Sequence, residues 1–121
     1  MNILILNNLE LKTFTEQDTL DYCQLNDINP NGIDELDLSY NKITDISTIK
    51  NLKSVKDLNI NNLELESDQI QYIKSLKKLK ELYCRKAFKN KTVLNKLNKN
   101  INIRIKNERN RIKQFKIKDI Y

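Results

Sequence analysis

The sequence predicts an α/β fold: a short, curved parallel sheet of about five strands on the concave side, with helices and 3₁₀ turns on the convex side. Short segments with apolar residues at every second position recur along the chain, which is typical of strands with one buried face. Apolar residues three apart follow in the next stretch, which is typical of a tight helical turn. Since one such unit cannot bury its own apolar face, neighbouring copies are expected to stack side by side.

The strand segments recur at nearly constant spacing. They are IDELDL at 33–38, VKDLNI at 55–60, LKELYC at 79–84 and INIRI at 101–105. Leu36 and Leu58 are 22 residues apart, and the next two spacings are 24 and 21 residues. A further copy lies at the start, where LILNNLEL at 4–11 nearly repeats LNINNLEL at 58–65. Five copies of one unit therefore fill most of the chain.

The unit L-x-x-L-x-L-x-x-N-x-L resembles the leucine-rich repeat family. The segment LDLSYNKITDISTIKNLKSVKDLNI, residues 36–60, is similar to the short, internalin-like type of repeat with about 22 residues. The resemblance is strong from Ile33 to Leu82 and weaker outside this range. It implies a leucine-rich repeat solenoid, and in this family the concave face of the sheet is the usual binding place for a protein partner.

We expect a single leucine-rich repeat domain over residues 1–121, because single domains most often contain about 100–150 residues. Residues 1–32 are expected to form a long, irregular first repeat that contains a helix. Residues 33–100 form the central repeats. Residues 101–121 form a basic C-terminal cap, with a closing strand at Ile101–Ile105, a return at Ile112–Ile117, and Phe115 over the last core layer.

Three helices and one tight turn are expected between the strands. The predicted helices are Glu16–Gln24 with Thr15 as its cap, Asp68–Leu76 with Ser67 as its cap, and a third that follows Thr92 through VLNKLNK. The tight turn contains Ile46, Ile49 and Leu52, which are three residues apart, as in a 3₁₀ or α turn.

Asn41 occupies the position of the asparagine that, in leucine-rich repeats, bonds backbone groups inside the turn. Leu9, Leu63 and Ala87 stand at the matching places of the other units. Those turns must satisfy their backbone groups in another way. We expect Asn8 or Asn62, shifted by one position, to do so.

The composition argues against catalysis. The chain has no histidine, one glycine and two cysteines. Metal sites usually need about four ligands, a cysteine nucleophile usually needs a histidine base, and phosphate-binding loops need several glycines. We therefore expect no enzyme activity, no metal site and no cofactor, and we interpret Cys23 and Cys84 as plain buried thiols.

Localisation is expected to be intracellular. No apolar run approaches the roughly 18 residues that suggest a membrane-spanning helix. The apolar patch at Ile3–Leu6 has no basic residue before it and no small-residue cleavage site after it, so a secretory signal is not expected.

Charge is segregated along the chain. The net charge is +6, but residues 1–84 carry 9 basic and 14 acidic residues, whereas residues 85–121 carry 13 basic and 2 acidic ones. Such asymmetry bears on association with partners.

Protein binding through the concave face is the main functional hypothesis. The candidate partner-binding residues are Asp37, Tyr40, Asn59, Tyr83, Arg85 and Arg104, since aromatic and arginine side chains often carry binding energy. The alternative is binding of RNA or DNA through the basic C-terminal region, with candidate residues Lys106, Arg109, Arg111, Lys113, Lys116 and Lys118. The edge strand at Ile3–Leu6 is either tolerated or pairs with another chain, which would make a homo-oligomer.

Overall fold

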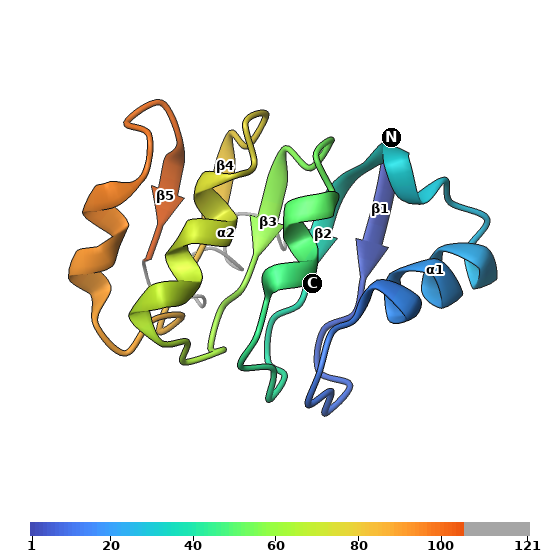
Figure 1. Cartoon of the computed structure of the whole chain (residues 1–121), viewed down its shortest axis with the longest axis horizontal. Helices are drawn as coiled ribbons and strands as arrows, with labels where there is room; N and C mark the ends of the chain where they lie inside the picture. Colours follow the sequence, from blue (N-terminus) through green and yellow to red (C-terminus); the bar gives the residue numbers. More distant parts are fainter. Residues whose placement is uncertain (106–121) are drawn as a thin grey trace, which may run out of the picture.

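One parallel sheet of five strands forms the centre of the structure, a computed structural model that describes residues 1–105. The strands are β1 Asn2–Ile5, β2 Ile33–Asp37, β3 Asp57–Asn59, β4 Glu81–Tyr83 and β5 Asn102–Arg104. They lie in sequence order, and each pairs in parallel with the next (Figure 1). The predicted α/β class with a five-stranded parallel sheet is confirmed.

Residues that the sequence aligns are also partners across the sheet. Leu4 pairs with Leu36, which in turn pairs with Leu58, and the same row continues to Leu82 and Ile103. The four leucines are buried, whereas Ile103, in the edge strand, is partly buried. The recurring spacing therefore places equivalent side chains in one layer of the core.

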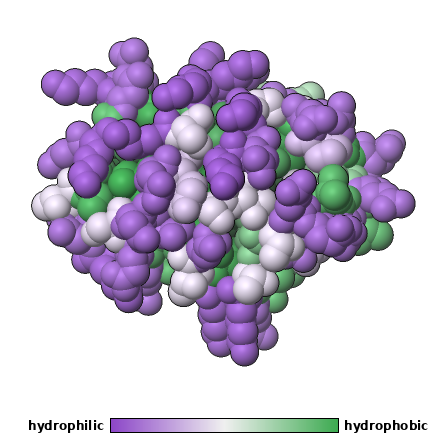
Figure 2. Space-filling view, viewed as in Figure 1, coloured by the Kyte–Doolittle hydropathy of each residue, from purple (hydrophilic) through white to green (hydrophobic). Residues whose placement is uncertain are grey.

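The helical segments lie on one face of the sheet (Figure 1). They are α1 Glu16–Leu25, η1 Pro30–Gly32, η2 Ser47–Asn51, η3 Ser67–Gln69, α2 Ile70–Lys74 and η4 Lys91–Lys96, where η marks a 3₁₀ helix. Segment α2 packs against η2 on one side and η4 on the other. The surface on this side is mostly hydrophilic, and some hydrophobic side chains reach it over α1 at the right-hand end (Figure 2).

Two predicted helical segments are confirmed. Segment η2 forms where the apolar spacing of three predicts a tight turn, and Ile46, Ile49 and Leu52 are all buried. Helix α1 begins at Glu16 as predicted. Its cap is reciprocal, because the Thr15 hydroxyl accepts from the Asp18 N–H at 3.1 Å and the Asp18 carboxylate accepts from the Thr15 N–H at 2.9 Å.

The other two helix predictions need correction. The helix predicted at Asp68–Leu76 is a 3₁₀ turn followed by the short α2, and Ser67 is the first residue of that turn and not its cap. The helix predicted after Thr92 is the 3₁₀ segment η4, which ends at Lys96. Its cap is Asn90, whose Oδ1 accepts from the Thr92 N–H at 3.0 Å. Short connections between neighbouring strands leave room for tight 3₁₀ turns better than for long α-helices.

Asn41 is buried and serves the turn as predicted. Its Nδ2 donates to the carbonyls of Leu6 and Leu38, at 2.8 and 3.0 Å, and its Oδ1 accepts from the N–H groups of Leu9 and Leu11, both at 3.0 Å. One side chain thus joins the turns after β1 and β2.

Asn61 has a related role at the next turn. Its Oδ1 accepts from the Arg85 N–H at 2.7 Å. The expectation of a shift to Asn62 is therefore wrong. Asn8 and Asn62 have positive φ values of 52° and 64°, and they occupy the left-handed positions of their turns.

The C-terminal cap is described only in part. Strand β5 forms within the predicted closing segment, and Ile105 after it is 48% exposed. The predicted return at 112–117 and Phe115 lie outside the described residues. None of the helices within residues 1–105 has the length and apolar character needed to cross a membrane.

Candidate protein-binding surface

The face of the sheet opposite the helices, called here the open face, is formed by every second side chain of the strands. Strand pairing arranges these side chains in two rows. The first row is Ile3, Glu35, Asp57, Glu81 and Asn102, and the second row is Ile5, Asp37, Asn59, Tyr83 and Arg104. Beyond the strand ends, Ser39, Asn61 and Arg85 continue the pattern. The open face therefore changes from apolar at β1, through acidic at β2 and β3, to aromatic and cationic at β4 and β5.

Glu35 and Asp57 form a pair of neighbouring carboxyl groups in the first row. Burial, a hydrogen bond to Asp57 and the negative charges of Asp57 and Asp34 together raise the pKa of Glu35 to about 7, with burial the largest cause. Both residues are half-buried. Near neutral pH, the Glu35 carboxyl group is therefore present both in a protonated form, which donates a hydrogen bond to Asp57, and in an ionised form.

Other carboxylates near this pair have cationic neighbours. Asp34 lies 3.6 Å from the Lys56 ammonium, and it accepts from the Asn2 N–H at 3.0 Å. The Asn2 hydrogen bond, opposed by some desolvation and helped by Lys56, lowers the pKa of Asp34. Glu81 accepts from the Arg104 Nε at 2.7 Å. Within residues 1–105, no ion pair is formed by Glu35 or Asp57.

Tyr83 and Arg104 form the aromatic and cationic end of the second row. The guanidinium carbon of Arg104 lies 5.8 Å from the centroid of the Tyr83 ring, within the range of a cation–π contact. The Glu81 carboxylate raises the pKa of Arg104 further above its already high ordinary value. Asn102 Nδ2 also donates to Glu81, at 2.9 Å. The Glu81 carboxylate and the Tyr83 ring thus orient the Arg104 guanidinium, while Arg104 remains exposed.

Tyr40 lies at the turn after β2 in a conformation that tyrosine rarely adopts. Its φ is 57°, in the left-handed region, and it is 40% exposed. The matching turn positions, at the same spacing as the strands, are Asn8, Asn62 and Lys86, all with positive φ. Asparagine tolerates this region better than tyrosine does. The backbone here therefore holds a large aromatic side chain at the surface against its conformational preference.

The remaining predicted contact residues differ in their exposure. Asp37 is half-buried, and its Oδ1 accepts from the N–H and the hydroxyl of Ser39 at 2.9 and 2.6 Å. Asn59 is only 7% exposed, and its Oδ1 accepts from the Asn61 N–H at 3.0 Å. Arg85 is half-buried. Of these three, Asn59 offers a partner the least surface.

The structure thus brings Asp37, Asn59, Tyr83 and Arg104 into one row, with Tyr40 and Arg85 at the turns beyond it. The candidate nucleic-acid-binding residues, Lys106, Arg109, Arg111, Lys113, Lys116 and Lys118, all lie outside the described residues. The sequence patterns did not predict the Glu35–Asp57 pair as a site, although acidic residues at 35, 57 and 81 recur at the spacing of the strands. That recurrence was the available signal.

Comparisons with protein-family models, curated proteins and solved structures found no match to this chain.

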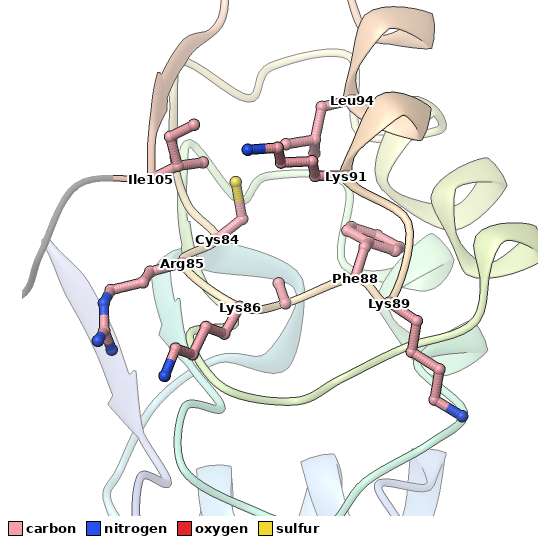
Figure 3. A pocket seen from close by; sticks show the side chains of 9 residues that line it. Cys84, Arg85, Lys86, Phe88, Lys89, Lys91, Leu94 and Ile105 are labelled. Atoms are coloured by element: carbon pink, nitrogen blue, oxygen red, sulfur yellow. The ribbon is translucent and has the colours of Figure 1, made fainter.

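A hollow of about 480 Å³ lies beside the end of β4, between the turn that follows it and η4 (Figure 3). The Cys84 sulfur points toward it, whereas the side chains of Arg85, Lys86 and Lys89 extend away from it (Figure 3). Burial raises the pKa of the Cys84 thiol to about 12, so almost no nucleophilic thiolate exists near neutral pH. Within the described part of the chain, no group of three acidic or cysteine side chains is placed to hold a metal ion.

Proposed function

We propose that the chain is a non-catalytic protein-interaction module that binds a protein partner through the open face. We further propose that it belongs to the leucine-rich repeat proteins and forms a short solenoid of the internalin-like type. The support for the second statement is the agreement between the 22- and 24-residue spacings of Leu36, Leu58 and Leu82 and their pairing in one row of the sheet.

The Tyr83–Arg104 pair on the open face is the observation that carries the binding proposal. Tyrosine and arginine are enriched among residues that dominate binding energy. Arg104 is already oriented by Glu81, so less side-chain freedom is lost when a partner binds. No helix of residues 1–105 covers this face (Figure 1).

Tyr40 adds independent support. Residues kept in sparsely populated backbone regions often lie at functional sites, because the strain is retained only where the side chain is useful or the structure forces it. Asparagine at the matching positions 8 and 62 shows that the turn can be built from a better-suited residue.

The experiment is affinity capture from lysate of the cells that produce the chain, with three baits. The first bait is the unchanged chain. The second carries Tyr83→Ala and Arg104→Ala on the open face, and the third carries Gln71→Ala and Lys74→Ala on α2. The proposal predicts one protein captured by the first and third baits and lost from the second. Equal capture by all three baits, or no specific capture, would contradict it.

Nucleic-acid binding is the second candidate, favoured by one observation. Residues 85–105 contain seven basic residues and no acidic one: Arg85, Lys86, Lys89, Lys91, Lys96, Lys99 and Arg104. Phosphate contacts make affinity fall steeply with salt. Titration of labelled RNA and DNA at about 50 mM and about 200 mM salt tests this candidate, and absence of binding at the lower concentration removes it.

A further inference from the structure

Within residues 1–105, strand β1 forms one edge of the sheet, and half of its backbone groups point away from β2. The Leu6 N–H donates to Asp37 O at 2.8 Å, and the Asn8 N–H donates to Ser39 O at 3.0 Å. Even-numbered residues of this segment therefore bond with β2. Since successive residues of a strand direct their N–H and C=O groups to opposite sides, Ile3 and Ile5 direct theirs to the outer edge.

Two side chains of this edge strand, Ile3 and Ile5, are apolar and exposed. Ile3 and Ile5 are 43% and 59% exposed. No charged side chain and no proline occurs from Met1 to Leu9. Natural edge strands usually carry such residues, or are very short, because an open edge invites another strand. At the other edge of the sheet within residues 1–105, β5 follows this rule, since it ends in the charged Arg104.

We propose that β1 pairs in antiparallel fashion with β1 of a second copy of this chain. Among the described residues 1–105, the outward backbone groups of β1 belong to its odd-numbered residues, so odd residues must face odd residues across the new ladder. One such register places Ile3 opposite Ile5 of the second copy, and Ile5 opposite Ile3. The contact is the same from both sides, as a twofold axis requires. The two sheets then continue into one.

A second copy suits this edge better than a charged strand does. The neutral side chains from Met1 to Leu9 match their own copies, whereas a charged strand would leave its charges without partners there. Residues 106–121 contain six basic and two acidic residues, so their net charge is positive. This charge is opposite to that of the acidic Glu35–Asp57 pair, whereas β1 offers no acidic side chain that would attract it. Helix α1 lies at the same end of the molecule (Figure 1), and its Leu20 and Leu25 are exposed.

The new interface lies at β1, whereas the Tyr83–Arg104 pair lies on β4 and β5, at the other end of the sheet (Figure 1). Each dimer would present two such pairs on faces joined through β1. A partner with two binding sites would then be held more tightly than by one copy, because the second contact becomes intramolecular.

The test is the molar mass of the full chain, measured by light scattering after gel filtration from about 1 µM to about 500 µM. We expect the mass to rise from 14.4 kDa toward twice that value. Ile5→Lys should weaken the dimer by about tenfold or more, since it places a charge on each side of the ladder. Ile5→Pro should do the same without breaking the β1–β2 bonds, because the Ile5 N–H points outward. The matched control is Ile105→Lys, beyond β5 at the opposite edge.

Circular dichroism of each variant shows whether it is folded, and only folded variants enter the comparison. A monomer at every concentration overturns the proposal. So does a dimer that persists in both Ile5 variants, or one that only Ile105→Lys disrupts. Hydrogen exchange supplies a further readout: slow exchange of the Ile3 and Ile5 amides should appear only where the dimer forms. Slow exchange in the monomer would mean that another segment of the same chain covers β1, and would also overturn the proposal.

Discussion

The guanidinium of Arg104 lies over the ring of Tyr83, with 5.8 Å between its carbon and the ring centroid. The two residues are 21 positions apart in the sequence and become neighbours only because β5 pairs with β4 in parallel register. Glu81, on the same strand as Tyr83, accepts a hydrogen bond from Arg104 at 2.7 Å. The register of the sheet therefore builds the proposed contact site from three residues on two short strands.

Arg104→Ala should separate binding from stability. We expect partner binding to weaken about tenfold or more, as for arginines that dominate interfaces. The free energy of unfolding should fall by less than about 1 kcal/mol, because exposed ion pairs and cation–π contacts contribute little. Calorimetry with the captured partner and urea unfolding measure the two quantities. Lys99→Ala, an exposed basic residue of the same region, is the control, and equal weakening by both variants would point to general charge and not to this site.

Tyr40→Asn should stabilise the chain while weakening partner binding. Asparagine tolerates a φ near 57° better than tyrosine, so the free energy of unfolding should rise by about 0.5–1 kcal/mol. Tyr40→Phe keeps both the ring and the strain and serves as the control. Urea unfolding of the three proteins is the measurement. A Tyr40→Asn variant no more stable than Tyr40→Phe would show that the turn is not strained by the aromatic residue.

Asn41→Ala should destabilise the fold strongly. The substitution leaves the backbone groups of Leu6, Leu9, Leu11 and Leu38 without their side-chain partner. Since buried unsatisfied polar groups cost about 1–3 kcal/mol each and water can reach some of them, we expect a loss of about 2–4 kcal/mol. Asn51→Ala, at an exposed asparagine, should change stability by less than about 0.5 kcal/mol. Similar effects of both variants in urea unfolding would refute this role of Asn41.

Glu35→Gln should change how stability depends on pH. The folded chain holds the Glu35 proton up to about pH 7, whereas the ordinary pKa of a glutamate side chain is 4.5. Because the folded state then binds more protons than the unfolded state, the free energy of unfolding contributed by this group falls as pH rises from 4.5 to about 7. Glutamine can donate to Asp57 without titrating, so this fall should disappear in the variant.

At about pH 8 the Glu35→Gln variant should therefore be more stable than the unchanged chain, by about 1–2 kcal/mol after allowance for solvent screening. Near pH 4.5 the two should be equally stable. Thermal and urea unfolding across this range measure the difference. Glu64→Gln controls for the general loss of a negative charge. A difference between Glu35→Gln and the unchanged chain that does not vary with pH would show that Glu35 is not protonated preferentially in the fold.

The strand positions could be predicted from the sequence, whereas only part of the candidate binding site could. Alternation and constant spacing assign Leu36, Leu58 and Leu82 to one buried layer, because strand geometry leaves a side chain only two faces. The lengths of the helical turns were less predictable, since 3₁₀ and α turns share similar apolar spacing over one turn. The coupling of Glu35 to Asp57 depends on cross-strand distance and burial, which a spacing pattern does not fix.

Photo-crosslinking to the captured partner tests the open face most directly. A photoreactive phenylalanine derivative is placed at Tyr83, on the open face, or at Tyr72, on α2 at the helical side, and both positions are half-buried in the unmodified chain. Binding through the open face predicts crosslinks to the partner from position 83 and none from position 72. Crosslinks from position 72 alone would contradict the assignment of partner binding to this face.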